Sequence, residues 1–229
     1  MLLLFDIDGT LLNRATQAHR DALHAALHDV HGVNVEGVRS PLSPAGRTDG
    51  EIARALLLGA GISALRIDER AGAVRDSCCA AFARLCPADL SDKVFPGIPA
   101  LLDWLAARGD VKLSLVTGNY EPIGRLKLGR AGIGRHFAPG QGGFGSDSED
   151  RAALPGIARR RAGGGGIAYP RQRTIVIGDT PRDIACAQAD GVRCFAVTTG
   201  PYEAADLTGA DAVASSAKEL RELLAATTD

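Results

Sequence analysis

Short runs of apolar residues recur along the chain, and several of them end directly in polar residues. Runs of this length predict strands that are buried on both faces of a parallel sheet. They lie at residues 2–5, 111–116, 174–178, 193–198 and 212–213. The first run leads straight into Asp6 and Asp8, and Gly9 then indicates that the strand ends and the chain turns.

Helical patterns lie between these strands. The stretch from residue 16 to residue 88 predicts helices throughout, with segments at 16–31, 49–58 and 67–85. In the first of these, Leu23, Leu27 and Val30 form a core-facing stripe, whereas His24, His28 and His31 lie on its flank. Later helices are expected at residues 100–108, 122–131, 148–161, 184–189 and 217–225.

The alternation of strands and helices outside residues 16–88 predicts an α/β fold, built on a doubly wound parallel sheet with right-handed connections. We therefore expect residues 1–15 and 89–229 to form the α/β catalytic core. Residues 16–88 are expected to form an all-α domain inserted directly after the first strand.

Polar groups follow three of the predicted strands. They are Asp6 with Asp8, the segment 117–119, and Asp179 with Asp183. The carboxyl ends of parallel strands meet at one edge of a sheet, where such folds bind their ligands. Carboxylates this close repel one another unless a cation lies between them, and Mg²⁺ prefers oxygen ligands of this kind. We therefore expect a magnesium site formed by side-chain oxygens of Asp6 and Asp179 and by the backbone carbonyl of Asp8.

The sequence Asp6-Ile7-Asp8-Gly9-Thr10 after an apolar strand resembles the nucleophile motif of the haloacid dehalogenase superfamily, whose members are mostly phosphatases. The strand ends at Thr117 and Asp179 resemble the second and fourth motifs of that family. The resemblance implies a Rossmann-like core with the first strand between the strands that end at these two residues. It also implies a helical cap domain, as in the subgroup that includes phosphoglycolate phosphatases and β-phosphoglucomutases.

Each motif then has an expected role. Asp6 would attack phosphorus and form an aspartyl-phosphate, while Asp8 would protonate the departing alcohol and later activate water. Asp183 would support the metal site without binding the ion directly. The groups expected to hold the phosphoryl oxygens are Thr117, Gly118, Asn119 and Arg151.

The third motif of the resembled family is a lysine or arginine between the second and fourth motifs, and two residues compete for it. Lys127 follows Thr117 closely and falls inside a predicted helix, where a solvated lysine is the ordinary expectation. Arg151 follows an expected strand and lies early in the helix predicted at 148–161, so it is preferred.

Arg47 is the one strong cation in the loop from Ser40 to Asp49. In the resembled family the corresponding loop of the cap reaches over the active site. Arg47 is therefore a candidate for binding a second anionic group of the substrate, such as a carboxylate. The alternative is a solvent-facing arginine paired with Asp49 or Glu51.

The composition limits which binding partners and which cellular compartment we expect. The formal net charge of −1 favours neither nucleic acid nor a membrane surface as a partner. No apolar segment reaches the length of a membrane span, and the first residues do not resemble a signal peptide. The five cysteines form no C-x-x-C pair, so free thiols in a cytoplasmic protein are expected.

These features predict a magnesium-dependent phosphatase that hydrolyses a small phosphorylated metabolite, such as phosphoglycolate, through an aspartyl-phosphate. A phosphomutase or phosphotransferase of the β-phosphoglucomutase type is the alternative, because it would use the same core residues. A dehalogenase needs no acid such as Asp8, and a binding module would not keep every acid. A phosphonate-cleaving enzyme needs an amine in the insert, but residues 16–88 contain no lysine. The substrate and the oligomeric state stay open.

Overall fold

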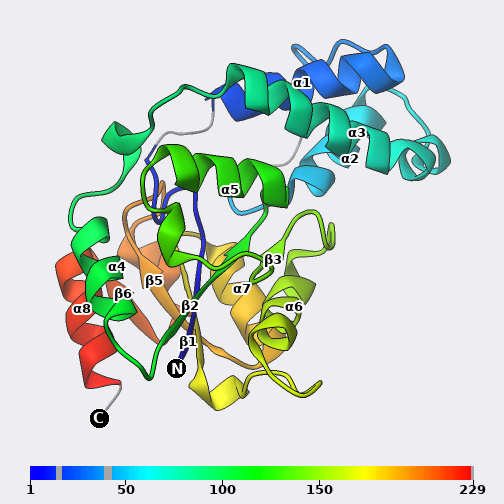
Figure 1. Cartoon of the computed structure of the whole chain (residues 1–229). Helices are drawn as coiled ribbons and strands as arrows, with labels where there is room; N and C mark the ends of the chain where they lie inside the picture. Colours follow the sequence, from blue (N-terminus) through cyan, green and yellow to red (C-terminus); the bar gives the residue numbers. More distant parts are fainter. Residues whose placement is uncertain (14–16, 39–42, 228–229) are drawn as a thin grey trace.

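The structure, a computed structural model, describes residues 1–13, 17–38 and 43–227. Its described part contains a six-stranded sheet in the order β3-β2-β1-β4-β5-β6, and every neighbouring pair is parallel (Figure 1). The strands are β1 Leu2–Phe5, β2 Lys112–Thr117, β3 Gly143–Phe144, β4 Thr174–Gly178, β5 Arg193–Val197 and β6 Ala212–Ala214. The doubly wound α/β fold is confirmed. Strand β1 lies between β2, which ends at Thr117, and β4, which ends one residue before Asp179.

Strand β1 is completely buried in the sheet. All four of its residues have no exposed surface. Leu2 pairs with Lys112 on one side and with Thr174 on the other. Because side chains alternate along a strand, Leu3 and Phe5 belong to one hydrophobic core and Leu2 and Leu4 to a second. A continuous apolar run is therefore what this position requires.

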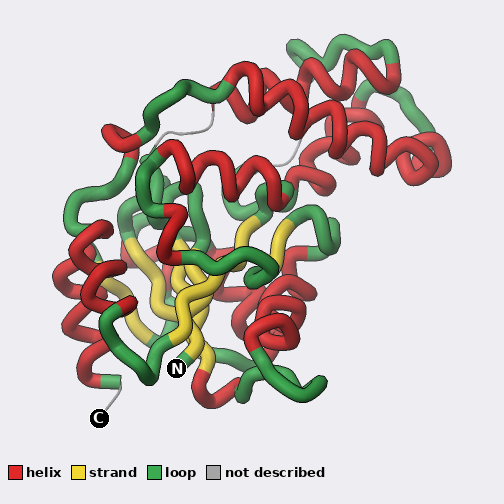
Figure 2. Tube along the Cα trace, in the orientation of Figure 1, coloured by secondary structure: helices red, strands yellow, loops and turns green. Residues whose placement is uncertain are grey.

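Helices cover both faces of the sheet, as Figure 2 shows. They are α1 Gln17–His31, α2 Asp49–Gly59, α3 Ala64–Leu85, α4 Ile98–Ala106, α5 Glu121–Arg130, α6 Leu154–Ala162, α7 Pro181–Asp190 and α8 Ala217–Ala226. Apolar residues of α4, α5 and α8 pack against one face, and those of α6 and α7 pack against the other. None of the helices in the described ranges combines the length and hydropathy that crossing a bilayer requires.

Helices α1, α2 and α3 lie beyond the carboxyl edge of the sheet, at the top of Figure 1. Leu23 and Leu27 of α1 are buried, as the predicted stripe required, and they pack in one cluster with Val74 and Cys78 of α3. The predicted helix start at Thr16, the predicted boundary after residue 15 and part of the predicted loop, 40–42, fall outside the described residues.

The helix starts predicted at residues 67, 148 and 184 were wrong by three residues or more, and the first of these helices begins at Ala64. The helix predicted from residue 148 begins at Leu154, after a 3₁₀ turn at Arg151–Ala153 in which the Asp150 side chain accepts a hydrogen bond from the Ala152 N–H. The helix predicted from residue 184 already begins at Pro181. Thr180 caps it, because Thr180 and Asp183 each accept a hydrogen bond from the other's backbone N–H.

The start of α2 was predicted correctly. Thr48 is the N-cap and its hydroxyl accepts a hydrogen bond from the N–H of Glu51. The Glu51 carboxylate accepts a hydrogen bond from the Arg47 guanidinium.

Candidate functional site

A cavity of about 880 Å³ lies at the carboxyl edge of the sheet, between the strand ends and helices α1 and α2. The sequence-predicted residues that line it are Asp6, Asp8, Arg47, Thr117, Gly118, Asn119, Arg151 and Asp179. They come from segments far apart in the chain, and parallel strands bring their ends together at this edge. Leu23, Ile52 and Leu56 supply an apolar wall on the helical side.

Three carboxylates meet beneath the cavity. Oxygen atoms of Asp6, Asp179 and Asp183 all lie within 4.8 Å of one another, and all three residues are buried. Burial raises the pKa of Asp6 and of Asp179, and the negative charges of neighbouring carboxylates raise both further. A buried set of hard oxygen atoms that repel one another is suited to a divalent cation, because the cation removes the repulsion.

The turn after β1 must be glycine for a steric reason. Gly9 has a φ of +93°, and a Cβ atom placed on it would lie 2.2 Å from Oδ2 of Asp179. The Thr10 hydroxyl donates a hydrogen bond to Oδ1 of Asp179 (3.0 Å), and the Thr199 hydroxyl donates one to the Gly9 carbonyl (2.6 Å). The first and fourth motifs are thereby held in direct contact.

Arg151 lies next to the predicted nucleophile. Its side chain is buried, and its Nη2 donates hydrogen bonds to Oδ1 of Asp6 (3.1 Å) and to Oδ1 of Asp183. Asp183 itself has no exposed surface, and its Oδ2 accepts hydrogen bonds from the Thr180 hydroxyl and N–H. Asp183 therefore holds both Arg151 and the start of α7 in place.

The expectation that Lys127 is solvated was wrong. Lys127 has no exposed surface, and its Nζ donates a hydrogen bond to Oδ2 of Asp8 at 2.6 Å. Helix α5 begins two residues after Asn119, so its last turn brings Lys127 back to the end of β1. Each of the first two acids thus has its own cation: Asp6 contacts Arg151 and Asp8 contacts Lys127.

The two oxygens of Asp8 differ in their surroundings. Oδ2 accepts hydrogen bonds from Lys127 and from Nδ2 of Asn119 (2.9 Å), whereas Oδ1 has no hydrogen-bond partner among the residues that the structure describes. Burial acts to raise the pKa of Asp8, but the charges of Lys127 and His19 and these hydrogen bonds outweigh it and hold that pKa below its ordinary value. Asp8 is therefore anchored through one oxygen only.

His19 is a site residue that the sequence analysis missed. It is buried on α1, with Nδ1 3.2 Å from Nζ of Lys127 and Nε2 3.0 Å from Oδ2 of Asp49. The signal was present in the sequence, because His19 precedes Leu23 by four residues and so lies on the same core-facing stripe.

The predicted loop residue Arg47 lines the cavity and is not solvent-facing, because only 11% of its side chain is exposed. Its guanidinium donates hydrogen bonds to Glu51 and to the Ser43 carbonyl. The pairing with Glu51 expected in the alternative interpretation is therefore present, although the position at the cavity is the one a substrate-binding residue would need.

Gly118 is where α2 contacts the sheet. Its carbonyl accepts a hydrogen bond from the Asp49 N–H (2.8 Å), and a Cβ atom placed on it would lie 2.0 Å from the Arg47 carbonyl oxygen. The Asp49 carboxylate also accepts a hydrogen bond from the Tyr120 N–H at 2.7 Å. The start of α2 is thus fixed directly against the loop that follows β2.

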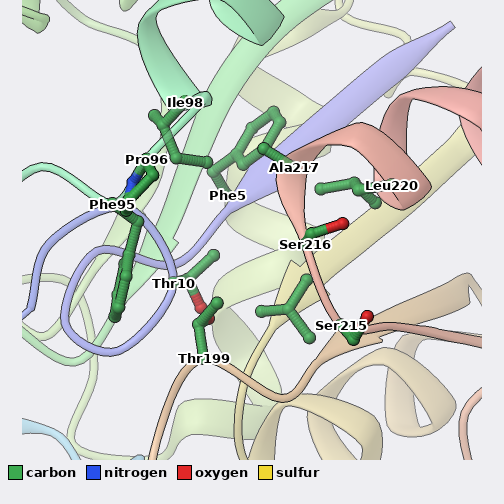
Figure 3. A pocket seen from close by; sticks show the side chains of 11 residues that line it. Phe5, Thr10, Phe95, Pro96, Ile98, Thr199, Ser215, Ser216, Ala217 and Leu220 are labelled. Carbon is green, nitrogen blue, oxygen red and sulfur yellow. The ribbon is translucent and has the colours of Figure 1, made fainter.

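A second, smaller cavity lies behind the site. It has a volume of about 230 Å³, and Thr10 and Thr199 form part of its wall (Figure 3). The rest of its lining includes Phe5, Phe95 and the beginning of α8. The two threonines that hold Asp179 and Gly9 thus separate the acidic site from a largely apolar space.

Comparisons with known proteins agree with this geometry. A family model described as haloacid dehalogenase-like hydrolase matches residues 3–188. A phosphoglycolate phosphatase of Pseudomonas fluorescens is 30% identical over 109 residues, which are 47% of this chain and 38% of that protein. Phosphoglycolate phosphatase 1 of Pseudomonas aeruginosa is 30% identical over 110 residues, with the same two coverages. The matched segment thus spans well under half the length of either curated relative.

Solved structures share the fold over nearly the whole chain. A protein described as a predicted phosphatase from Clostridium acetobutylicum has a TM-score of 0.69 at 20% identity, covering 98% of both chains. A β-phosphoglucomutase from Clostridium difficile has a TM-score of 0.67 at 18% identity, covering 99% of this chain and 96% of the other. Because the family model matches most of the chain, the chain belongs to the haloacid dehalogenase-like hydrolases.

Proposed function

We propose that this protein is a magnesium-dependent phosphatase that hydrolyses a small phosphorylated metabolite through an aspartyl-phosphate on Asp6. The observation that carries the proposal is the pairing of Asp6 with Arg151 beside two further buried carboxylates, at the base of a cavity that Asp8 also lines. A nucleophile, an acid–base group and cations for phosphoryl charge are thereby present in one place.

Asp6 attacks phosphorus. Arg151 holds Oδ1 of Asp6, so we assign the attack to the other carboxylate oxygen, Oδ2. The bond from phosphorus to the ester oxygen breaks, and the alcohol leaves with a proton from Asp8. Asp8, now a carboxylate, takes a proton from a water molecule that attacks the aspartyl-phosphate, which releases phosphate and restores Asp6.

The lowered pKa of Asp8 suits the second of these steps, in which it acts as a base. The first step needs a protonated Asp8. An arriving phosphate group adds negative charge beside Asp8, and such charge raises the pKa of a neighbouring carboxyl group. Substrate binding therefore favours the protonation state that the first step requires.

The phosphoryl oxygens are assigned to the loop after β2 and to Arg151. The Thr117 hydroxyl oxygen accepts a hydrogen bond from Nδ2 of Asn119 (3.0 Å), which leaves its own proton free to be donated to a phosphoryl oxygen. Gly118 and Asn119 follow directly and both line the cavity, and the Asn119 N–H donates to the Thr117 hydroxyl oxygen (3.4 Å), so the backbone donor assigned to the phosphoryl group is the Gly118 N–H. Donors fixed in advance stabilise the charge that develops in phosphoryl transfer.

The donor set fits Mg²⁺. We assign the ion to Asp6 and Asp179 through their carboxylates and to Asp8 through its backbone carbonyl, with Asp183 acting through its contact with Arg151. When bound, the ion supplies positive charge that offsets the carboxylates and the phosphoryl group. This assignment explains why carboxylates are gathered here although burial and neighbouring negative charges raise the pKa of Asp6 and of Asp179.

Phosphoglycolate is the substrate that the curated relatives suggest, by their names. A carboxylate on a small phosphate ester could replace Glu51 as the partner of Arg47, because both would accept from the same guanidinium. We therefore propose a substrate that carries a second anionic group.

The test is phosphate release from a panel of phosphorylated metabolites, including phosphoglycolate, with Mg²⁺ and with a chelator. We expect release with Mg²⁺ and none with the chelator. Full activity without divalent metal would contradict the metal assignment, and no activity on any ester would contradict the phosphatase assignment. Isomerisation of a sugar phosphate without net phosphate release would identify a phosphomutase.

A further inference from the structure

A line of hydrogen bonds, buried except at its Asp8 end, runs from Asp8 into the helices beyond the sheet. Oδ2 of Asp8 contacts Lys127 (2.6 Å), Lys127 contacts Nδ1 of His19 (3.2 Å), and Nε2 of His19 contacts Asp49 (3.0 Å). Asp49 in turn accepts from the N–H of Tyr120, beside the phosphate-binding loop. We call Asp8, Lys127, His19 and Asp49 the buried relay.

The chemistry of the four groups fixes the direction of each hydrogen bond. The Lys127 ammonium has no acceptor, so Nδ1 of His19 must accept from it. Nε2 of His19 then carries the ring proton and donates it to the Asp49 carboxylate. This arrangement requires the Nε2–H tautomer of His19, and it leaves the ammonium oriented by acceptors on both sides.

A buried ammonium needs such partners. Moving a charged amine out of water is costly unless hydrogen bonds and an opposite charge compensate it. Lys127 has no exposed surface, and Ile123 and Leu128 of the same helix are also buried, in the hydrophobic core. If Lys127 served only to fill space, a leucine or methionine would be the ordinary residue at this position. The buried charge of Lys127 beside Asp8 therefore indicates a role other than packing.

That role follows from what Lys127 does to Asp8. Lys127 and Asn119 both hold Oδ2, so Oδ1, to which no described residue hydrogen-bonds, is the oxygen left to exchange a proton with the leaving alcohol. Lys127 and Asp8 belong to the α/β part of the chain, whereas His19 and Asp49 belong to α1 and α2. The relay is therefore complete only when α1 and α2 are docked as they are in this structure.

We propose that Lys127 and His19 are positioning residues for proton transfer by Asp8, and that docking of α1 and α2 on the sheet completes this arrangement through Asp49. The proposal rests on the proposed phosphatase function, and it adds a link between the helices that enclose the substrate and the acid that releases the alcohol. Neither residue is assigned a contact with the substrate.

The first test uses the dependence on leaving group. An alkyl phosphate needs a proton on its departing oxygen, whereas 4-nitrophenyl phosphate releases a stable phenolate that needs none. In His19→Phe the ring keeps its packing beside Phe82, whose centroid lies 5.5 Å from that of His19, but both ring nitrogens are lost. We expect kcat/KM for the alkyl ester to fall about 10- to 100-fold, and that for the aryl ester to change by less than about threefold.

The controls separate this effect from general damage. His28→Phe alters an exposed residue of the same helix and should change neither value. His19→Asn keeps a side-chain acceptor near the position of Nδ1 and should recover part of the alkyl activity. An equal fall for both esters in His19→Phe, or no fall for either, would overturn the proposal. Failure of the unaltered protein to hydrolyse any ester would instead overturn the proposed function.

The second test does not depend on turnover. The ¹⁵N resonances of the His19 ring in the folded protein should show a protonated Nε2 and an unprotonated Nδ1. Substitution Lys127→Met should shift the Nδ1 resonance more than the Nε2 resonance, because Nδ1 loses its donor. A protonated Nδ1 in the unaltered protein would exclude the contact with Lys127 on which the relay depends.

Discussion

Asp6 and Asp8 are separated by one residue, but they experience different electrostatic environments. Asp6 shares a buried space with Asp179 and Asp183, and its pKa is raised. Asp8 is next to Lys127, and its pKa is lowered in spite of burial. Two identical side chains thereby acquire distinct chemical characters, as the roles proposed for them, nucleophile and acid–base group, require.

The nucleophile assignment predicts a large loss of activity in Asp6→Asn. An amide in place of the carboxylate cannot form the aspartyl-phosphate, so kcat should fall by at least about a thousandfold. Phosphate release under saturating substrate and Mg²⁺ measures this. Asp76→Asn, which removes an exposed carboxylate on α3, is the matched control and should leave kcat unchanged. Retention of more than a few per cent of activity by Asp6→Asn would contradict the assignment.

Arg47→Ala tests the proposed second anionic group. Loss of a charge-assisted hydrogen bond should weaken binding of phosphorylated carboxylates by about 1.5–3 kcal/mol, seen as a higher KM. The KM of an aryl phosphate, which offers no carboxylate, should hardly change. If both substrates respond equally, or neither does, Arg47 serves only to hold Glu51 and the loop from Ser43.

Some residues of the site could be identified from the sequence, and others could not. The acids at the strand ends were found because each follows an apolar run directly, and a strand's direction fixes where its end lies. Lys127 was misjudged and His19 missed because their roles depend on each other and on Asp8, across more than a hundred residues of chain. No local pattern distinguishes a lysine that faces water from one that returns to the site.

At the level of elements, strands were predicted more reliably than helix starts. The bounds of β4 agree with the prediction, because an apolar run has clear limits. The predicted helix from residue 148 began too early because Asp150 caps a 3₁₀ turn, which places Arg151 before α6 and not inside it. Arg151 was expected early in a helix. It lies instead in this 3₁₀ turn, and from there its side chain contacts Asp6.

The contact between α2 and the sheet predicts an effect of Gly118→Ala. The added methyl group would meet the Arg47 carbonyl, so α2 must move or the loop after β2 must distort. We expect a loss of about 1–3 kcal/mol in the free energy of unfolding, measured with urea. Gly72→Ala, in the middle of α3 with nothing within 4 Å of the new atom, should instead be neutral or stabilising. Equal stability of the two variants would show that α2 is not held in this position.

For the whole molecule, the acid cluster predicts how stability depends on pH and metal. The pKa of Asp179 is raised from 3.8 to about 8, so the folded state binds a proton that the unfolded state has lost over this range. The Asp179 carboxyl group makes its full contribution to the free energy of unfolding below about pH 4, and this contribution is lost as the pH rises toward 8. Without metal, Asp179→Asn should therefore become more stable relative to the unaltered protein between pH 5 and 8.

With Mg²⁺ bound, the unaltered protein should instead be more stable than Asp179→Asn, because the ion stabilises only the folded protein that keeps the Asp179 carboxylate. Thermal unfolding of both proteins across this pH range, with Mg²⁺ and with chelator, measures the difference. A constant difference between the two proteins at all pH values, with or without the ion, would contradict a repulsive cluster that a cation relieves.

The position of β1 also has a consequence for biosynthesis. This strand lies inside the sheet, yet its partners are separated from it in the chain, and Leu2 pairs with Lys112 and with Thr174. A ribosome that adds about 5–20 residues per second needs on the order of ten to thirty seconds to reach the second partner after making the first residues. During that interval a leucine-rich segment has an unpaired edge, so a newly made chain is exposed to misassembly until β4 emerges.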